Sequence, residues 1–207
     1  MPPKVKFQKD EIVRAALRIT CAQGIDAVTS REVARELGVS TRPIFTWYDG
    51  MDQLKRDVYE LAKEEYRDYI RRGLSGPIPF LGVGQQYIRF AKEKPELYKL
   101  LFLTPPGETV GGAMEALRLS QELARESIMR IYRMDEATAD KYFRDLWLVV
   151  FSLATLIVTD GCPYTDAEMS AILTEVSLSV CKVYKEIPGL PEGRFDKDAI
   201  FRELVQK

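Results

Sequence analysis

Apolar residues recur every three or four positions along most of the chain, which is the spacing of amphipathic helices. Residues 9–23 place five of them on one side of a predicted helix that Gly24 ends, namely Ile12, Val13, Ala16, Leu17 and Ile19. No segment alternates between apolar and polar residues for long enough to predict a strand. The pattern therefore predicts an all-α protein.

Residues 24–54 contain two short predicted helices separated by a glycine. Thr29 and Glu32 have the spacing of a capping box, in which each side chain bonds the backbone amide of the other residue, so the first helix begins near residue 30. Gly38 ends this helix in a left-handed conformation. Ser40 is placed to cap a second helix over residues 41–48, with Pro43 in its first turn.

The second helix is too short to be stable alone, so we expect it to dock through Val39, Ile44 and Tyr48. The side chains left exposed are then Thr41, Arg42, Thr46 and Trp47. Two short helices with basic and aromatic side chains on the second are typical of a helix-turn-helix, which places its second helix in the DNA major groove.

Longer helices follow this segment. Residues 51–72 form a predicted helix that links a helix-turn-helix DNA-binding domain, residues 1–50, to a C-terminal helical ligand-binding and dimerisation domain, residues 51–207. The two glycines, two prolines and serine within residues 73–79 should end that helix. Further helices are predicted over residues 80–94, 95–103, 110–132, 135–159, 166–185 and 196–205, and Thr165 with Glu168 forms a second capping box.

Composition and charge exclude several classes of protein. The formal net charge is -1, so the chain as a whole is not a basic nucleic-acid binder. Residues 1–50 carry eight Lys/Arg against six Asp/Glu, a balance of +2 that leaves -3 for the rest, so the DNA-binding prediction rests on the motif. The apolar run at residues 146–158 falls short of the roughly 20 residues that span a bilayer, and it predicts a buried helix.

The sequence offers no catalytic or metal-binding pattern. It contains no histidine, and its three cysteines, Cys21, Cys162 and Cys181, are dispersed, so we expect no metal site, redox sensor or cofactor. Nucleophile, phosphate-binding and dinucleotide-binding motifs are missing as well, and we expect that the protein is not an enzyme. Because no signal-peptide pattern begins the sequence, we expect a cytoplasmic protein.

The helix-turn-helix segment resembles the N-terminal domain of the tetracycline-repressor (TetR) family of bacterial regulators. At the spacing usual in that family, the chain has Thr29, Val33-Ala34, Gly38-Val39-Ser40, Ile44-Phe45, Tyr48 and Leu54. The resemblance covers residues 9–56. Two residues depart from it: Phe45 replaces a tyrosine whose hydroxyl reaches a phosphate, and Met51 replaces a lysine.

This resemblance implies a set of DNA contacts. The planar guanidinium of Arg42 can donate two hydrogen bonds to the edge of a guanine. Short side chains with hydrogen-bond donors at the starts of both helices can bind phosphates. The family position of Pro43 usually faces DNA, which suits a thymine methyl. The full predicted DNA-binding set is Thr29, Ser30, Arg31, Thr41, Arg42, Pro43, Phe45, Thr46 and Trp47.

The C-terminal half is similar to one TetR subgroup. Residues 88–102 carry its aromatic-alanine pair, proline and aromatic-rich helix, whereas the subgroup's Trp-x-x-x-His-Gly becomes Trp147 followed by Phe151-Ser152. The aromatic residues of this half can be ordinary core, but as a set they suggest an apolar chamber for a hydrophobic or planar effector. The predicted lining is Gln86, Phe90, Tyr98, Phe102, Met114, Leu117, Trp147, Phe151 and Thr155, with Ser120 and Arg144 as further polar candidates.

The sequence thus predicts a homodimeric regulator. Its last two long helices, residues 143–158 and 169–184, are apolar on more than one side, which suits a two-fold interface between identical chains. The predicted partners are double-stranded DNA with a palindromic operator, a small-molecule effector that releases a repressor, and a second copy of the chain. The alternative is a helical small-molecule- or partner-binding protein whose DNA-binding domain has decayed, for which Phe45 and Met51 are the evidence.

Overall fold

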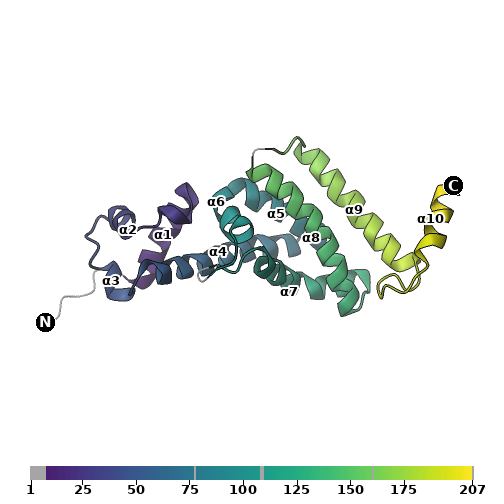
Figure 1. Cartoon of the computed structure of the whole chain (residues 1–207), viewed down its shortest axis with the longest axis horizontal. Coiled ribbons are helices and arrows are strands. Elements are labelled where there is room, and N and C mark those ends of the chain that lie inside the picture. The colour runs from purple at the N-terminus through teal and green to yellow at the C-terminus, as the bar shows by residue number, and fades with distance from the viewer. Residues whose placement is uncertain (1–7, 77, 108–109, 160, 207) are drawn as a thin grey trace.

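The computed structural model describes residues 8–76, 78–107, 110–159 and 161–206 (Figure 1). Within these ranges every regular element is a helix, which confirms the all-α prediction. The molecule is elongated, with the N-terminal helices at one end and the C-terminal helices at the other. None of the helices in the described ranges has the length and apolar character needed to cross a membrane.

Three helices and a short turn form the N-terminal domain. They are α1 (Lys9–Gln23), the 3-10 turn η1 (Ile25–Ala27), α2 (Ser30–Leu37) and α3 (Ile44–Trp47). The apolar side of α1 is buried as its periodicity predicts, with Ile12 and Ala16 fully enclosed. Val33 of α2 and Ile44 of α3 complete this small core.

The start of α2 matches the prediction only in part. Thr29 Oγ1 accepts the Glu32 amide at 3.2 Å, and Gly38 ends the helix at a φ of 67°. The predicted bond from the Thr29 amide to the Glu32 carboxylate is wrong, because this carboxylate instead pairs with Arg35 on the next turn. Glu32 therefore contributes to the surface of α2 rather than to its start.

The second helix of the motif is shorter than predicted. It begins at Ile44 rather than at Thr41, because residues 41–43 form a turn in which the Ile44 amide donates to the Thr41 carbonyl at 3.1 Å. Pro43 occupies the N-cap position, and no side chain caps the helix, so the prediction of a Ser40 cap is wrong.

The long helix α4 (Met51–Leu74) runs from the N-terminal domain into the body of the molecule (Figure 1). Its predicted end at residue 72 is two residues short. Gly73 remains helical and lies against Gly82 of α5 (Pro79–Glu93), where a Cβ added to Gly73 would come within 2.6 Å of the Gly82 backbone. The glycine thus permits a backbone-to-backbone crossing. Pro77, part of the same predicted boundary, is outside the described residues.

The C-terminal domain continues through α6 (Pro95–Tyr98), a π-helical turn η2 (Lys99–Leu103), α7 (Ala113–Tyr132), α8 (Glu136–Val158), α9 (Asp166–Glu186) and α10 (Lys197–Gln206). The helix α7 starts three residues later than predicted, because Gly112 precedes it at a φ of 71°. The predicted capping box at the start of α9 is confirmed, since Thr165 and Glu168 bond each other in both directions. At the start of α8, the Asp135 side chain accepts the Thr138 amide and caps the helix. Glu108 and Thr109 lie in the segment between the predicted helices 95–103 and 110–132, and they are outside the described residues.

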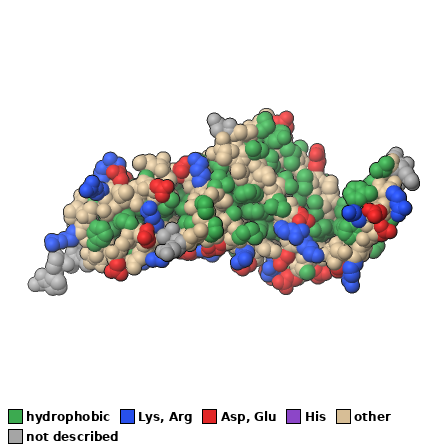
Figure 2. All heavy atoms as spheres, viewed as in Figure 1, with side chains coloured by type: hydrophobic (Ala, Val, Ile, Leu, Met, Phe, Trp, Pro, Cys, Tyr) green, Lys and Arg blue, Asp and Glu red, His purple; other side chains and the backbone are tan. Residues whose placement is uncertain are grey.

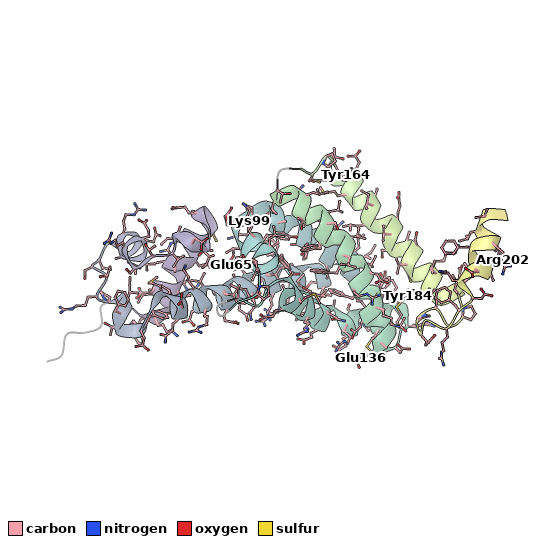
Figure 3. All side chains as sticks on the ribbon, viewed as in Figure 1. Glu65, Lys99, Glu136, Tyr164, Tyr184 and Arg202 are labelled. Atoms are coloured by element: carbon pink, nitrogen blue, oxygen red, sulfur yellow. The ribbon has the colours of Figure 1, made fainter. Side chains whose placement is uncertain are left out.

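The helix α9 is the least buried of the long helices. Of its described residues only Met169 and Leu173 are buried. Figure 3 shows Tyr184 of α9 near α8, where its hydroxyl donates to Asp145 at 2.6 Å. This arrangement leaves α9 as the outer wall of the C-terminal domain.

Candidate nucleic-acid interface and ligand cavity

The short helix α3 has one buried side and one exposed side. Ile44 is fully buried and Tyr48, just after the helix, is only 3% exposed, whereas Phe45 and Trp47 are 51% and 39% exposed. Arg42 and Thr46 are exposed as well. The predicted docking of α3 is therefore confirmed for Ile44 and Tyr48. For Val39 it is wrong, because this residue is only half-buried and does not pack against the core.

The end of α3 is fastened to two other helices. The Tyr48 hydroxyl donates to Asp57 Oδ2 of α4 at 2.8 Å, and Lys9 Nζ of α1 lies 2.7 Å from the same oxygen. Burial, and then the hydrogen bond to Asp57, raise the pKa of Tyr48 above its ordinary value. Tyr48 is therefore a neutral hydrogen-bond donor over the physiological pH range, and it fixes the orientation of α3.

All nine predicted DNA-binding residues lie at least partly on the surface. Thr29 and Arg31 are exposed and Ser30 is half-buried at the start of α2, while Thr41 and Pro43 are half-buried before α3. No carboxylate of the described residues pairs with Arg42, whereas Arg18 and Arg35 are bound to Glu36 and Glu32. The Arg42 fork is thus available to an external acceptor. Contact of these residues with DNA stays a prediction.

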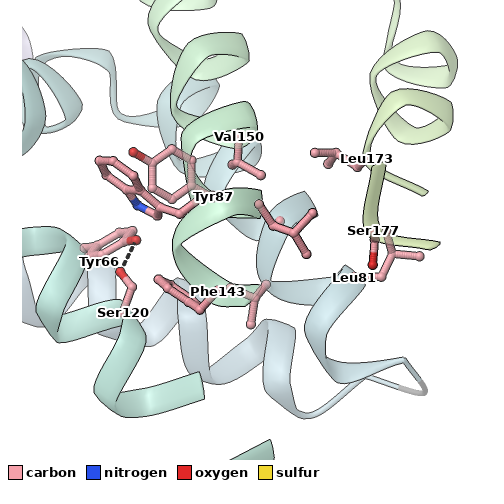
Figure 4. Close-up of a pocket in the computed structure, with 12 residues that line it drawn as sticks. Tyr66, Leu81, Tyr87, Ser120, Phe143, Val150, Leu173 and Ser177 are labelled. Carbon is pink, nitrogen blue, oxygen red and sulfur yellow. Dashed lines mark hydrogen bonds between the residues drawn. The ribbon is translucent and has the colours of Figure 1, made fainter. Parts of the chain in front are cut away.

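The C-terminal domain contains a small cavity between α4, α5, α7, α8 and α9 (Figure 4). Its volume is about 40 Å³, and aromatic, aliphatic and hydroxyl side chains form its walls. The lining residues are Tyr66, Leu81, Val83, Gly84, Tyr87, Ser120, Phe143, Leu146, Trp147, Val150, Leu173 and Ser177. None of them carries a charge.

Hydroxyl groups at the cavity are ordered by hydrogen bonds. Ser120 Oγ donates to the Ala116 carbonyl at 2.9 Å, so in the 2.6 Å bond between Tyr66 and Ser120 the tyrosine hydroxyl is the donor (Figure 4). Desolvation raises the pKa of Tyr66, which keeps this hydroxyl neutral. The Trp147 indole Nε1, in contrast, is buried and has no hydrogen-bond partner in the part of the chain that the structure describes.

Among the predicted ligand-lining residues and polar candidates, Trp147 and Ser120 line the cavity. Phe90, Tyr98, Phe102 and Leu117 are buried in the core. Phe151 stacks on Trp147 with ring centroids 4.8 Å apart, and Thr155 Oγ1 lies 3.1 Å from the Tyr98 hydroxyl. Gln86 also has a buried, unpartnered oxygen, but it is not part of this lining.

Two predicted residues lie away from the cavity. Met114 is 58% exposed, because the turn around Gly112 starts α7 with that position facing solvent. Arg144 is on the surface of α8, where it pairs with Asp145 at 2.7 Å. Sequence reasoning missed Tyr66, Gly84, Leu173 and Ser177 as lining residues, since periodicity identifies an apolar face but not which of its residues border a cavity.

Comparison with known proteins agrees with the geometry of the N-terminal domain. Residues 12–58 match the family model described as bacterial regulatory proteins, tetR family. The matched span includes the helix-turn-helix and the first turns of α4. No curated protein matches the chain. The members of this family are regulators rather than enzymes. Residues 12–58 thus carry an N-terminal DNA-binding domain of the tetR family of bacterial regulatory proteins.

Proposed function

We propose that the protein is a homodimeric repressor that binds a palindromic operator and leaves it when a small apolar or aromatic effector enters the C-terminal domain. The observation that carries this proposal is the geometry of α3. This helix is held in place by Ile44 and Tyr48, and it presents the exposed rings of Phe45 and Trp47 to the outside. The exposed Arg42, which pairs with no carboxylate of the described residues, lies in the turn just before it. A rigid helix with such side chains suits the major groove.

Each exposed group has a role in this proposal. Arg42 donates in bidentate fashion to a guanine edge, and Phe45 and Pro43 contact thymine methyl groups. Hydroxyls, the Arg31 guanidinium and the Trp47 indole N–H hold phosphates, which fixes the register of the protein on DNA without reading sequence. The proposed phosphate-binding residues are Thr29, Ser30, Arg31, Thr41, Thr46 and Trp47.

Exposed apolar side chains on α8 and α9 support dimerisation. Leu148 and Leu156 of α8 are 52% and 37% exposed, and Leu178 and Val183 of α9 are 66% and 39% exposed. Figure 2 shows hydrophobic side chains gathered over the middle of the visible face, where α8 lies. A two-fold pairing of these helices would bury them and hold two copies of α3 about 34 Å apart, one turn of DNA.

The cavity and the DNA-binding domain are joined by packed contacts. Asp57, which holds Tyr48, and Tyr66, which lines the cavity, are both on α4, about 14 Å apart along the helix. The α5–α6 junction also contacts this region, since Lys94 Nζ lies 3.2 Å from Glu65 Oε2 of α4. An effector that displaces Tyr66 would thus tilt α4 and change the separation of the two α3 helices.

The proposal is tested by replacing Arg42 and a distant arginine on the same chain. An operator is first selected from random DNA, and binding is then compared for Arg42→Ala and for Arg71→Ala, whose exposed side chain pairs with Asp68 near the far end of α4. Arg42→Ala should lose about 1–3 kcal/mol of binding free energy on the selected operator, and it should no longer discriminate between bases at one position of each half-site. Arg71→Ala should bind as the parent does.

Other outcomes have defined meanings. If Arg42→Ala weakens binding equally on the operator and on all its single-base variants, Arg42 holds a phosphate. If it binds as tightly and selectively as the parent, α3 is not the helix that reads the sequence, and the proposal is wrong.

A further inference from the structure

Trp147 carries a buried hydrogen-bond donor that no acceptor satisfies. Its side chain is 7% exposed, it lines the cavity, and Nε1 has no partner among the described residues. Buried tryptophan N–H groups usually find a partner, because an unmet donor keeps the cost of desolvation without the gain of a bond. At the wall of a cavity, that partner can be supplied by a ligand.

From this we infer the chemical class of the effector: an uncharged ring compound with a hydroxyl group, of which phenols are the simplest example, whose oxygen accepts a hydrogen bond from the Trp147 indole. The inference rests on the proposed ligand-responsive function and specifies its ligand.

The other polar groups of the cavity favour a hydroxyl over other acceptors. Because Ser120 donates to the Ala116 carbonyl and Tyr66 donates to Ser120, the Tyr66 oxygen still has a lone pair to accept with. A ligand hydroxyl can accept from Trp147 and donate to Tyr66, whereas a ketone or ether can only accept. The Trp147 N–H as donor and the Tyr66 oxygen as acceptor together therefore match a ligand hydroxyl, which can both accept and donate.

The walls exclude a charged ligand. All twelve lining residues are uncharged, and Tyr66, Tyr87, Phe143 and Trp147 supply aromatic rings. A carboxylate or an ammonium group would lose its hydration here without meeting an opposite charge, which is strongly unfavourable. An aromatic ring, in contrast, gains edge and face contacts with these side chains.

The cavity must widen to admit a ring. Its volume of about 40 Å³ suits one water molecule, whereas sites for small organic ligands are typically about 300–1,000 Å³. Within one chain, α9 is the wall with the fewest buried residues, and it contributes Leu173 and Ser177 (Figure 4). Gly84 of α5 lets this wall come close, since a Cβ there would be 3.3 Å from Leu173 Cδ1.

We therefore assign α9 as the wall that moves outward when the ring enters. Since α9 also carries exposed apolar residues of the proposed dimer surface, its displacement would act on the separation of the two DNA-binding domains.

Three probes of similar size test the inference: 4-ethylphenol, 4-ethyltoluene and 4-ethylbenzoate. Binding to the full-length protein is measured by titration calorimetry without DNA. The chain has two tryptophans, so Trp47→Phe leaves Trp147 as the single fluorescent reporter at the cavity. We expect 4-ethylphenol to bind about tenfold more tightly than 4-ethyltoluene and to change Trp147 fluorescence, because its hydroxyl accepts from Trp147 and donates to Tyr66. The carboxylate should not bind.

The Trp147→Phe variant removes the N–H and keeps an aromatic ring. It should still bind 4-ethyltoluene and lose most of the tenfold preference for 4-ethylphenol, because only the bond to Tyr66 is left. Trp47→Phe, the matched control, should keep that preference. Leu173→Ala offers a second test that leaves Trp147 in place. By widening the cavity at α9 it should strengthen binding of both neutral probes several-fold and leave the phenol preference unchanged.

The inference is overturned if 4-ethylphenol and 4-ethyltoluene bind with equal affinity, or if 4-ethylbenzoate binds most tightly. It also fails if a folded Trp147→Phe variant keeps the full preference for 4-ethylphenol. It is also overturned if no probe binds to protein that still binds its operator, and that result leaves the DNA-binding proposal intact. If 4-ethylphenol binds with the expected preference but the operator complex persists, the assigned site stands and the effector-release part of the proposed function fails.

Discussion

Two neighbouring residues of α3 allow fold and DNA recognition to be separated. Ile44 is 0% exposed and Phe45 is 51% exposed, although they follow one another in the chain. Truncating a fully buried isoleucine to alanine typically costs about 2–5 kcal/mol, through lost burial and the cavity left behind. We expect Ile44→Ala to lose about 3 kcal/mol, because Ile44 is the main buried contact of a four-residue helix. Phe45→Ala should lose less than about 1 kcal/mol, since half of its ring already faces water.

The operator-binding effects should show the reverse order. Phe45→Ala removes a proposed contact with DNA and should weaken operator binding about tenfold while the protein stays folded. Ile44→Ala should weaken binding only to the extent that it unfolds or loosens α3, so lowering the temperature or adding a stabilising osmolyte should restore much of its affinity.

Urea unfolding, followed by helix circular dichroism and tryptophan fluorescence, gives the stability change of each variant. Operator titrations below the unfolding transition give the affinities. If Phe45→Ala destabilises the protein as much as Ile44→Ala, or if Ile44→Ala has no effect on stability, the described orientation of α3 is wrong.

Three further predictions concern other contacts. Gly73→Ala should lower the unfolding temperature by several degrees, because its Cβ would lie 2.6 Å from the α5 backbone, whereas Gly107→Ala, with nothing within 4 Å, should not. Because burial and Asp57 raise the pKa of Tyr48 above 10.0, its contribution to stability is complete below pH 10.0 and is lost as the pH rises through the folded-state pKa. Urea unfolding at alkaline pH should therefore show a smaller pH dependence in Tyr48→Phe. Met51→Lys should steepen the salt dependence of DNA binding by about one unit of log-log slope, and an unchanged slope would show that this helix start does not approach the DNA backbone.

Local signals made most of the fold predictable. The caps at Thr29 and Thr165 and the left-handed Gly38 are decided by nearby residues, and the structure has each of them. The exposed side of α3 could be predicted for the same reason, since Ile44 and Tyr48 mark its buried side in the sequence.

The errors arose where distant residues decide. The neighbouring glycines and prolines predict a helix end at Gly73. However, α4 continues through it because Gly82, on another helix, packs against it. Likewise, Met114 fits an apolar pattern, but the start of α7 turns it to solvent. The unpaired Trp147 N–H depends on how five helices pack together, and no pattern in one helix reveals it.

The central claim is that two copies of the chain read two major grooves on one side of the DNA. The most direct measurement compares binding to the selected palindromic operator with binding to the same operator carrying an insertion of half a helical turn, about five base pairs, between its half-sites. The account predicts a complex of two chains on the parent operator and a large loss of affinity on the longer one, because the insertion rotates one half-site to the opposite face of the duplex. Equal affinity for both DNAs, or binding of a single chain to a single half-site with full affinity, would contradict it.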